Sequence, residues 1–124
     1  MKADTLQLAI TEQRAPWTDV EIDTREFTVF RDKYPVTEGH LLIVPKEATQ
    51  ENILKCFNFA VTMGYDNVAS EKTNITGYNI GLNVGESAGQ TVMYPHVHLL
   101  FRRNGDMEDP KGGVRGVIPS KQKY

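Results

Sequence analysis

A single long helix is predicted near the middle of this 124-residue chain, while most other patterned segments are predicted to be strands. Between Thr49 and Lys72, apolar and small residues recur near helical spacing, at Ile53, Phe57, Ala60, Val61, Gly64 and Val68. This period predicts a helix with its apolar face turned toward a sheet. Because strands lie near both ends of the chain with the helix between them, we expect an antiparallel α+β layer rather than a parallel sheet.

Short alternating or apolar runs predict about five strands around that helix. They cover residues 20–22, 26–30, 41–44, 78–84 and 94–102, and the first two are expected to pair as a hairpin. The segment 41–44 is apolar throughout, which favours a strand buried on both faces. Residues 4–14 predict a short N-terminal helix capped by Asp4, and the turn-rich residues 103–124 predict an extended C-terminal arm.

The composition is that of one domain spanning residues 1–124, with 40% hydrophobic and 24% charged residues. A formal charge of -2 gives no general attraction to a nucleic-acid polymer or an anionic membrane. No apolar run approaches the length of a membrane span and the first residues lack the apolar centre of a secretory signal, so we expect a cytoplasmic protein. One cysteine, Cys56, excludes an internal disulfide.

Two of the three histidines lie two residues apart in the segment GQTVMYPHVHLLFRR, residues 89–103. Side chains alternate along a strand, so His96 and His98 are expected on one face with their Cβ atoms about 7 Å apart. Both imidazoles can then reach one small anionic group, which one ring attacks while the other donates a hydrogen bond. Upstream, Gly89, Gln90 and Thr91 can aim backbone N–H groups at an oxyanion. Two other interpretations of the pair are structural histidines and metal ligands.

The span NVGESAGQTVMYPHVHLLFR, residues 83–102, resembles the signature of the histidine triad nucleotide hydrolases and transferases. The core of that signature is Gly-Gln-Ser/Thr-Val-x-His-x-His-x-His followed by two apolar residues. Tyr94 stands at the first triad histidine, His96 at the second and His98 at the third. A second block, FRDKYPVTEGHLLIVPK, residues 30–46, matches the family's other strand pattern and puts His40 on its additional active-site histidine.

This resemblance runs from about Trp17 to the C-terminus and implies the histidine triad (HIT) fold. It also implies hydrolysis at the α-phosphate of dinucleoside polyphosphates or nucleoside phosphoramidates through a nucleotidyl-histidine formed on His96. The backbone carbonyl of Tyr94 would accept the proton of the other His96 nitrogen. The other implied catalytic residues are His98, His40 and Gln90.

The resemblance further implies a site for a purine nucleoside monophosphate moiety. Its implied substrate-binding residues are Phe30 beside the base, Asp32 on the ribose, Asn83, Gly89 and Thr91 near the phosphate, and Tyr94, whose phenol would meet the leaving group or seal the pocket. No metal and no cofactor are implied. The family also implies a two-fold homodimer, for which the apolar residues of the C-terminal arm, Val114, Val117 and Ile118, would supply contacts.

Three other functions are compatible with the sequence. The tyrosine at position 94 is compatible with a nucleotide-binding module that has lost catalysis. Pro95 before His96 is similar to the transferase branch, His-Pro-His-x-Gln, although that branch has glutamine where this chain has His98. A metalloprotein would use His40, His96 and His98 as a three-histidine site.

Overall fold

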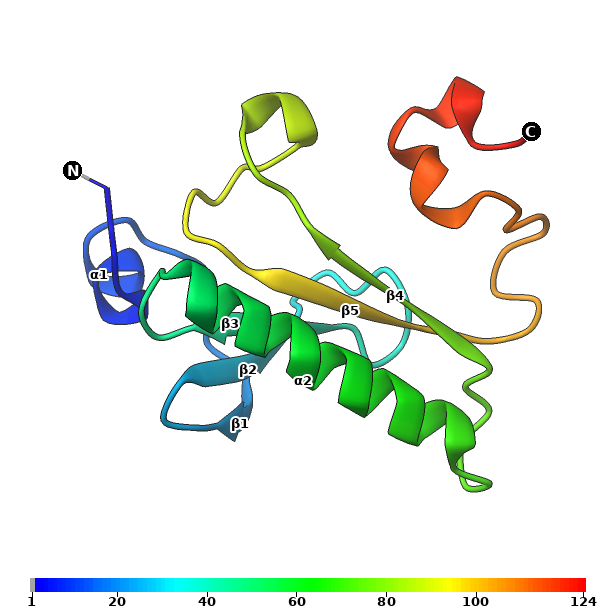
Figure 1. The fold of residues 1–124 in the computed structure, drawn as a ribbon, viewed down its shortest axis with the longest axis horizontal. Coiled ribbons are helices and arrows are strands. Elements are labelled where there is room, and N and C mark those ends of the chain that lie inside the picture. The colour runs from blue at the N-terminus through cyan, green and yellow to red at the C-terminus, as the bar shows by residue number, and fades with distance from the viewer. Residues whose placement is uncertain (1) are drawn as a thin grey trace.

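The computed structural model describes residues 2–124 and contains a five-stranded antiparallel sheet with a long helix across one face (Figure 1). The strand order is β1-β2-β3-β5-β4, and all neighbouring strands are antiparallel. The predicted α+β class and five-stranded sheet are therefore confirmed. In chain order the helices and strands are α1 (Leu6–Thr11), β1 (Val20–Asp23), β2 (Phe27–Arg31), β3 (Leu41–Pro45), α2 (Gln50–Ala69), β4 (Gly77–Leu82) and β5 (Val97–Arg102).

Strand β3 lies at the centre of the sheet between β2 and β5, and all of its residues are buried. On one face, Leu41 and Ile43 pack in a core with β2, β5 and α2. On the other face, Leu42 and Val44 pack with α1, Trp17 and neighbouring aromatic residues. The predicted burial of this strand on both faces is confirmed, because a helix-bearing layer covers each side.

Helix α2 begins after Thr49, whose side-chain oxygen accepts a hydrogen bond from the backbone N–H of Asn52. The buried face of the helix consists of Cys56, Ala60 and Gly64. At Gly64 the ring of Tyr78 approaches so closely that a Cβ atom would lie 2.6 Å from it. Small residues therefore let α2 lie close to β4.

The face that α2 turns toward the sheet is only partly the predicted one: Ala60 and Gly64 are buried and Phe57 packs against the core, as predicted. Val61 and Val68 were expected to be buried, but they are exposed on the outer side together with Leu54 and Tyr65. Cys56 lies on the buried face in place of Val61 and Val68 because close contact with the sheet requires small side chains. An exposed apolar stripe remains along α2.

Helix α1 is shorter than predicted, and its cap is Thr5 rather than Asp4. The side-chain oxygen of Thr5 accepts a hydrogen bond from the N–H of Leu8 at 3.2 Å. The carbonyl of Asp4 instead accepts a bond from Ala48, which ties the segment to the start of α2. Arg14 has a positive φ of 54°, so the chain cannot continue as a helix through it.

Strand β5 begins at Val97 rather than Tyr94, so Tyr94 and His96 lie just before the strand. Its ladders with β3 and β4 both end at Val97. Pro95 has no N–H to extend either ladder. His98 lies within the strand opposite Leu42 of β3.

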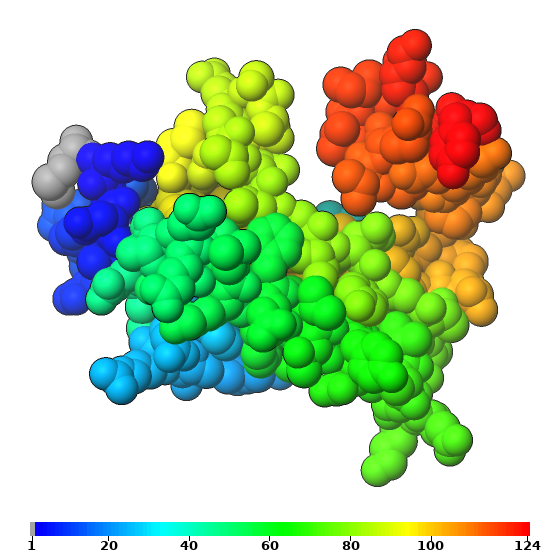
Figure 2. Space-filling model, in the orientation of Figure 1, coloured from blue at the N-terminus to red at the C-terminus, as the bar shows by residue number. Residues whose placement is uncertain are grey.

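The C-terminal arm, residues 103–124, is coiled rather than extended. It contains two 3-10 helices, Gly113–Val117 and Pro119–Lys121, and stands away from the sheet as a separate lobe (Figures 1 and 2). Gly112 has a φ of 93°, and a Cβ atom there would collide with the backbone oxygen of Gln122. This close approach turns the arm back on itself.

Candidate active site

The fold brings the three histidines of the chain together on the sheet face opposite α2. His40 directly precedes β3, His98 lies on the neighbouring strand β5, and His96 directly precedes β5. The ring centroids of His96 and His98 are 5.1 Å apart, and those of His40 and His98 are 5.2 Å apart. His40 is at least 56 residues from His96 and His98 in the sequence. The fold nevertheless brings it into one cluster with them, as the two matched sequence blocks predict.

A chain of hydrogen bonds fixes the tautomers of two of these rings. The backbone N–H of Val36 donates to Nδ1 of His40 at 3.1 Å, so a neutral His40 carries its proton on Nε2. That nitrogen lies 2.9 Å from Nδ1 of His98 and donates to it. Neutral His98 therefore carries its own proton on Nε2, where it is available to a ligand.

Both of these histidines are uncharged at neutral pH. Burial, together with the neighbouring His96 and His40, lowers the pKa of His98 to about 4. Burial also lowers the pKa of His40, although Asp32, with its carboxylate oxygen 3.5 Å from Nε2, acts in the opposite direction. The neutral state is the one that the hydrogen-bond chain requires.

His96 carries the complementary tautomer. Its Nδ1 lies 2.8 Å from the backbone carbonyl oxygen of Tyr94, which can only accept a hydrogen bond. The proton of neutral His96 is therefore on Nδ1, and Nε2 has a free lone pair. The indole of Trp17 packs against the imidazole, with ring centroids 5.1 Å apart, and limits its rotation.

A cavity of about 340 Å³ opens beside His96 and His98. Most of the residues that the sequence assigned to the site line this cavity: Asp32, Asn83, Gly89, Gln90, Thr91, His96 and His98. His40 lies behind His98, where it contacts the ring rather than this cavity. The cavity has room for a small organic phosphate.

The amide of Gln90 is used within its own loop. Its oxygen accepts from the N–H of Gly85 at 2.9 Å, and its nitrogen donates to the carbonyl of Val92 at 3.1 Å. Gly89 has a φ of 91°, a left-handed conformation that suits glycine and ends the short 3-10 turn Glu86–Ala88. Gln90 therefore holds the shape of the loop at the edge of the cavity.

The model of the HIT domain matches residues 16–105 of this chain. The chain belongs to the HIT family. It is 30% identical over 111 residues to an uncharacterised HIT-like protein of Synechococcus elongatus, covering 84% of this chain and 95% of that protein. It is also 30% identical over 112 residues to the nitrilase and fragile histidine triad fusion protein of Caenorhabditis elegans, covering 86% of this chain but only 26% of that longer protein.

Solved structures of HIT proteins have the same fold. A zinc-bound histidine triad family protein from Mycobacterium smegmatis superimposes with a TM-score of 0.67 at 28% identity, covering 85% of this chain and 79% of that one. A diadenosine triphosphate hydrolase from Plasmodium falciparum superimposes with a TM-score of 0.60 at 26% identity, covering 73% of this chain and 65% of that one. In the part of the chain that the structure describes, no helix is long and apolar enough to cross a membrane.

The side chain at the first triad position of this HIT protein does not face the cavity beside His96. Tyr94 is 1% exposed, and its hydroxyl donates to the carbonyl of Pro45 at 2.6 Å. Burial raises the pKa of the phenol, so it remains a donor. The expectation that the phenol meets a leaving group is corrected, because this hydrogen bond keeps it in the core; only the Tyr94 carbonyl reaches His96.

Phe30 also lies behind the site rather than in it. It is 3% exposed and supports Trp17, whose ring centroid is 6.1 Å away. Trp17 lines the cavity, although the motif comparison did not select it. The available signal was that the only tryptophan of the chain stands at the start of the region resembling the family.

Asp32, His40 and His98 place three donor atoms within 4.8 Å of one another, which is close enough for a metal ion. This set contains Asp32 where the three-histidine metal hypothesis had His96. A metal on Nε2 of His40 would require the proton to move to Nδ1, where it would face the Val36 N–H. The hydrogen-bond chain thus opposes metal binding and favours a neutral proton-donating His98.

Proposed function

We propose that this protein is a nucleotide hydrolase that attacks the α-phosphorus of a nucleoside phosphoramidate or dinucleoside polyphosphate. One observation carries the proposal. Nε2 of neutral His96 is unprotonated, Nε2 of His98 is protonated, and both rings border the same cavity. A nucleophile beside a hydrogen-bond donor is the arrangement that substitution at phosphorus needs.

In the first step the lone pair of His96 Nε2 forms a bond to the α-phosphorus, and the bond from phosphorus to the leaving nitrogen or oxygen breaks. The leaving atom keeps the electron pair and takes a proton from water. The nucleotidyl-imidazole gains a positive charge, and its Nδ1–H stays on the Tyr94 carbonyl. The Nε2–H of His98 donates to a non-bridging phosphate oxygen as charge develops there.

In the second step water attacks phosphorus and loses a proton, and the bond from phosphorus to Nε2 breaks. His96 recovers its lone pair and the nucleoside monophosphate is released. Trp17 offers a flat apolar wall to a purine base, and Asp32 offers carboxylate oxygens to the ribose hydroxyls. Asn83 and Thr91 are assigned to the phosphate side of the same cavity.

The decisive experiment is to incubate the protein with adenosine phosphoramidate, to quench it with alkaline denaturant, in which a phosphorus–nitrogen bond to histidine survives, and to look for a nucleotidyl mass on the peptide that contains His96. His96→Ala should lower kcat/KM by about a thousandfold or more, because it removes the covalent route. A protein that binds nucleotide without turnover, and gains activity only as Tyr94→His, would instead be a binding module.

We also propose that the protein is a two-fold homodimer. The exposed stripe on α2 consists of Leu54, Val61, Tyr65 and Val68, which are 59%, 46%, 67% and 38% exposed. Val114, Val117 and Ile118 of the arm are exposed as well. An exposed apolar stripe such as that on α2 is typical of a protein interface, and a second copy of the chain is the occupant that we propose.

A further inference from the structure

The cavity beside the histidines has a part that the chemistry at phosphorus does not use. His96 and His98 border the cavity, and its other lining residues include Trp17 and residues 31–34, which end β2 and continue into the following loop. In the proposed function the α-phosphate lies beside the two histidines and the ribose at Asp32. A base attached to that ribose therefore reaches Trp17 and the residues on either side of Asp32.

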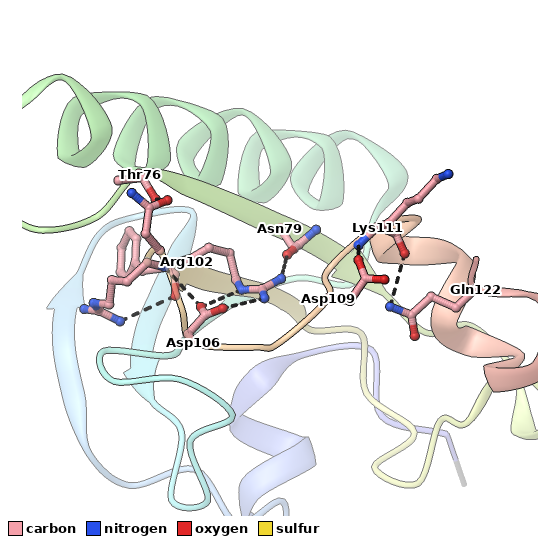
Figure 3. A network of polar contacts seen from close by, with 10 residues as sticks. Thr76, Asn79, Arg102, Asp106, Asp109, Lys111 and Gln122 are labelled. Atoms are coloured by element: carbon pink, nitrogen blue, oxygen red, sulfur yellow. Dashed lines mark hydrogen bonds and ion pairs between the residues drawn. The ribbon is translucent and has the colours of Figure 1, made fainter. Parts of the chain in front are cut away.

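Two arginines around the histidine cluster are already paired with carboxylates. The Nη1 atom of Arg31, which lines the cavity of about 340 Å³, lies 2.8 Å from Asp19, and its Nη2 atom pairs with Glu21. Arg102 lines a larger cavity, of about 540 Å³, between the sheet and the C-terminal arm. Its Nε and Nη2 atoms donate to the two carboxylate oxygens of Asp106 at 2.8 and 2.7 Å (Figure 3). Neither guanidinium group is therefore a free cation for a ligand.

Lys33 differs from these arginines, because its ammonium group has no partner among the described residues although it lines the smaller cavity. An ammonium group offers three donors and no acceptor, and the indole N–H of Trp17 is likewise only a donor. Asp32 is the one carboxylate among the described residues that line this cavity, and one of its oxygens already accepts from the N–H of Tyr34 at 2.7 Å. The wall that meets the base is thus rich in donors and poor in acceptors.

Purine bases differ in the edge that they present to such a wall. Guanine and hypoxanthine carry two acceptors, O6 and N7, side by side, whereas adenine carries N7 beside an amino donor. An ammonium group can donate to both acceptors of guanine, but it would face the amino group of adenine. A phosphate on the ribose is a poorer partner, because the carboxylates of Asp19, Glu21 and Asp32 outnumber the cations of this segment and would repel it.

We propose that Lys33 is a specificity-determining residue that selects a purine with a 6-oxo group, guanine or hypoxanthine, over adenine. The proposal rests on the proposed hydrolase function for the places of the phosphate and the ribose, and it adds the class of base. The ammonium group of Lys33 donates to O6 and N7 while the base lies against the indole of Trp17. Lys33 therefore acts on the choice of substrate and not on the bonds to phosphorus.

The first test measures binding without turnover. In calorimetric titrations, GMP and IMP should have dissociation constants about five- to tenfold below that of AMP, the lower range for a base-edge contact, because Lys33 is exposed. The analogue 7-deaza-GMP, which lacks the N7 acceptor, should bind less tightly than GMP. Equal dissociation constants for GMP, IMP and AMP would overturn the proposal, since Lys33 would then be a solvated surface cation.

Substitutions at Lys33 assign the preference to its side chain. Lys33→Met removes the charge with little change in length, and GMP and AMP should then bind about equally. Lys33→Arg retains a cation with parallel donors and should retain the preference. Lys72→Met is the matched control, since Lys72 is also exposed but lies outside the cavity, and it should behave as the parent protein. A preference for GMP that survives Lys33→Met would refute the role of Lys33.

Two further measurements separate this proposal from its alternatives. Adenosine 3′,5′-bisphosphate should bind no more tightly than AMP, and tighter binding that depends on Lys33 would make this residue a phosphate contact and sink the base assignment. Guanosine phosphoramidate should be cleaved with a higher kcat/KM than adenosine phosphoramidate, and Lys33→Met should remove the difference. If neither is cleaved but binding stays selective for GMP through Lys33, the hydrolase is overturned and the base selection stands. Failure to bind any of these nucleotides would overturn both.

Discussion

Replacing Tyr94 with phenylalanine should lower the stability of the protein while leaving its chemistry largely intact. The substitution removes the hydroxyl that donates to the Pro45 carbonyl at 2.6 Å and keeps the aromatic ring in place. The Tyr94 carbonyl that accepts from His96 belongs to the backbone and is unchanged. In the proposed mechanism, stability and catalysis therefore depend on different atoms of the same residue.

The expected loss of stability follows from the burial of this hydrogen bond. Leaving a buried carbonyl without its donor costs about 1–3 kcal/mol in the free energy of unfolding. A chain of 124 residues has an unfolding entropy of about 0.26 kcal/mol per kelvin near its Tm. Tm should therefore fall by about 4–12 °C. The activity should stay within about tenfold of the parent, which is 1.4 kcal/mol in barrier height.

Urea unfolding and kcat/KM with adenosine phosphoramidate measure the two effects on the same preparation. Tyr94→His should also stay within about tenfold in activity, because it retains the backbone carbonyl. A Tyr94→Phe protein with an unchanged Tm and a loss of activity of about a hundredfold or more would refute the reasoning, since the phenol would then act in the chemistry.

Three further predictions concern the ribose contact, the histidine pKa and the dimer. Asp32→Ala should weaken nucleoside monophosphate binding by about 1–3 kcal/mol in calorimetry, whereas Asp66→Ala, which changes a carboxylate on α2 outside the cavity, should not; equal affinities for Asp32→Ala and the parent protein would remove Asp32 from the site. The NMR titration of His98 should have its midpoint near pH 4. Because the pKa of this histidine is about 6.5 in the unfolded chain, the unfolded chain binds the proton at a higher pH than the folded protein does. The free energy of unfolding should therefore fall as the pH falls from about 6.5 to 4. A midpoint near 6.5 would contradict the burial of this ring. The protein should sediment as a dimer at micromolar concentration, and Tyr65→Glu on α2 should weaken the dimer more than Tyr34→Glu on an exposed loop; a monomeric parent protein would contradict the dimer.

Local sequence patterns predicted the elements that form the framework of the site. The hairpin of β1 and β2, the buried strand β3 and the long helix α2 all formed near their predicted positions. These elements follow from hydrophobic periodicity and caps, which act over a few residues. Two sequence blocks likewise indicated that His40, His96 and His98 would lie together, because they matched motifs with known spacing.

The tertiary structure decided how individual side chains are used. The phenol of Tyr94 lies in the core because its acceptor, the Pro45 carbonyl, is 49 residues away in sequence. The tautomer of His98 depends on His40, which is 58 residues away in sequence and is brought to it by the pairing of β3 with β5. No local pattern contains these partners.

The same distinction applies to packing. Helical periodicity predicted α2 and the burial of Ala60 and Gly64, but the burial of Cys56 in place of Val61 and Val68 depended on how closely the sheet approaches, which Tyr78 sets at Gly64. The sequence by itself determined which elements form and which chemistry-bearing residues they hold, because those properties arise from neighbouring residues. Only the tertiary structure decided which atoms face the cavity, because hydrogen bonds and steric contacts between distant segments select them.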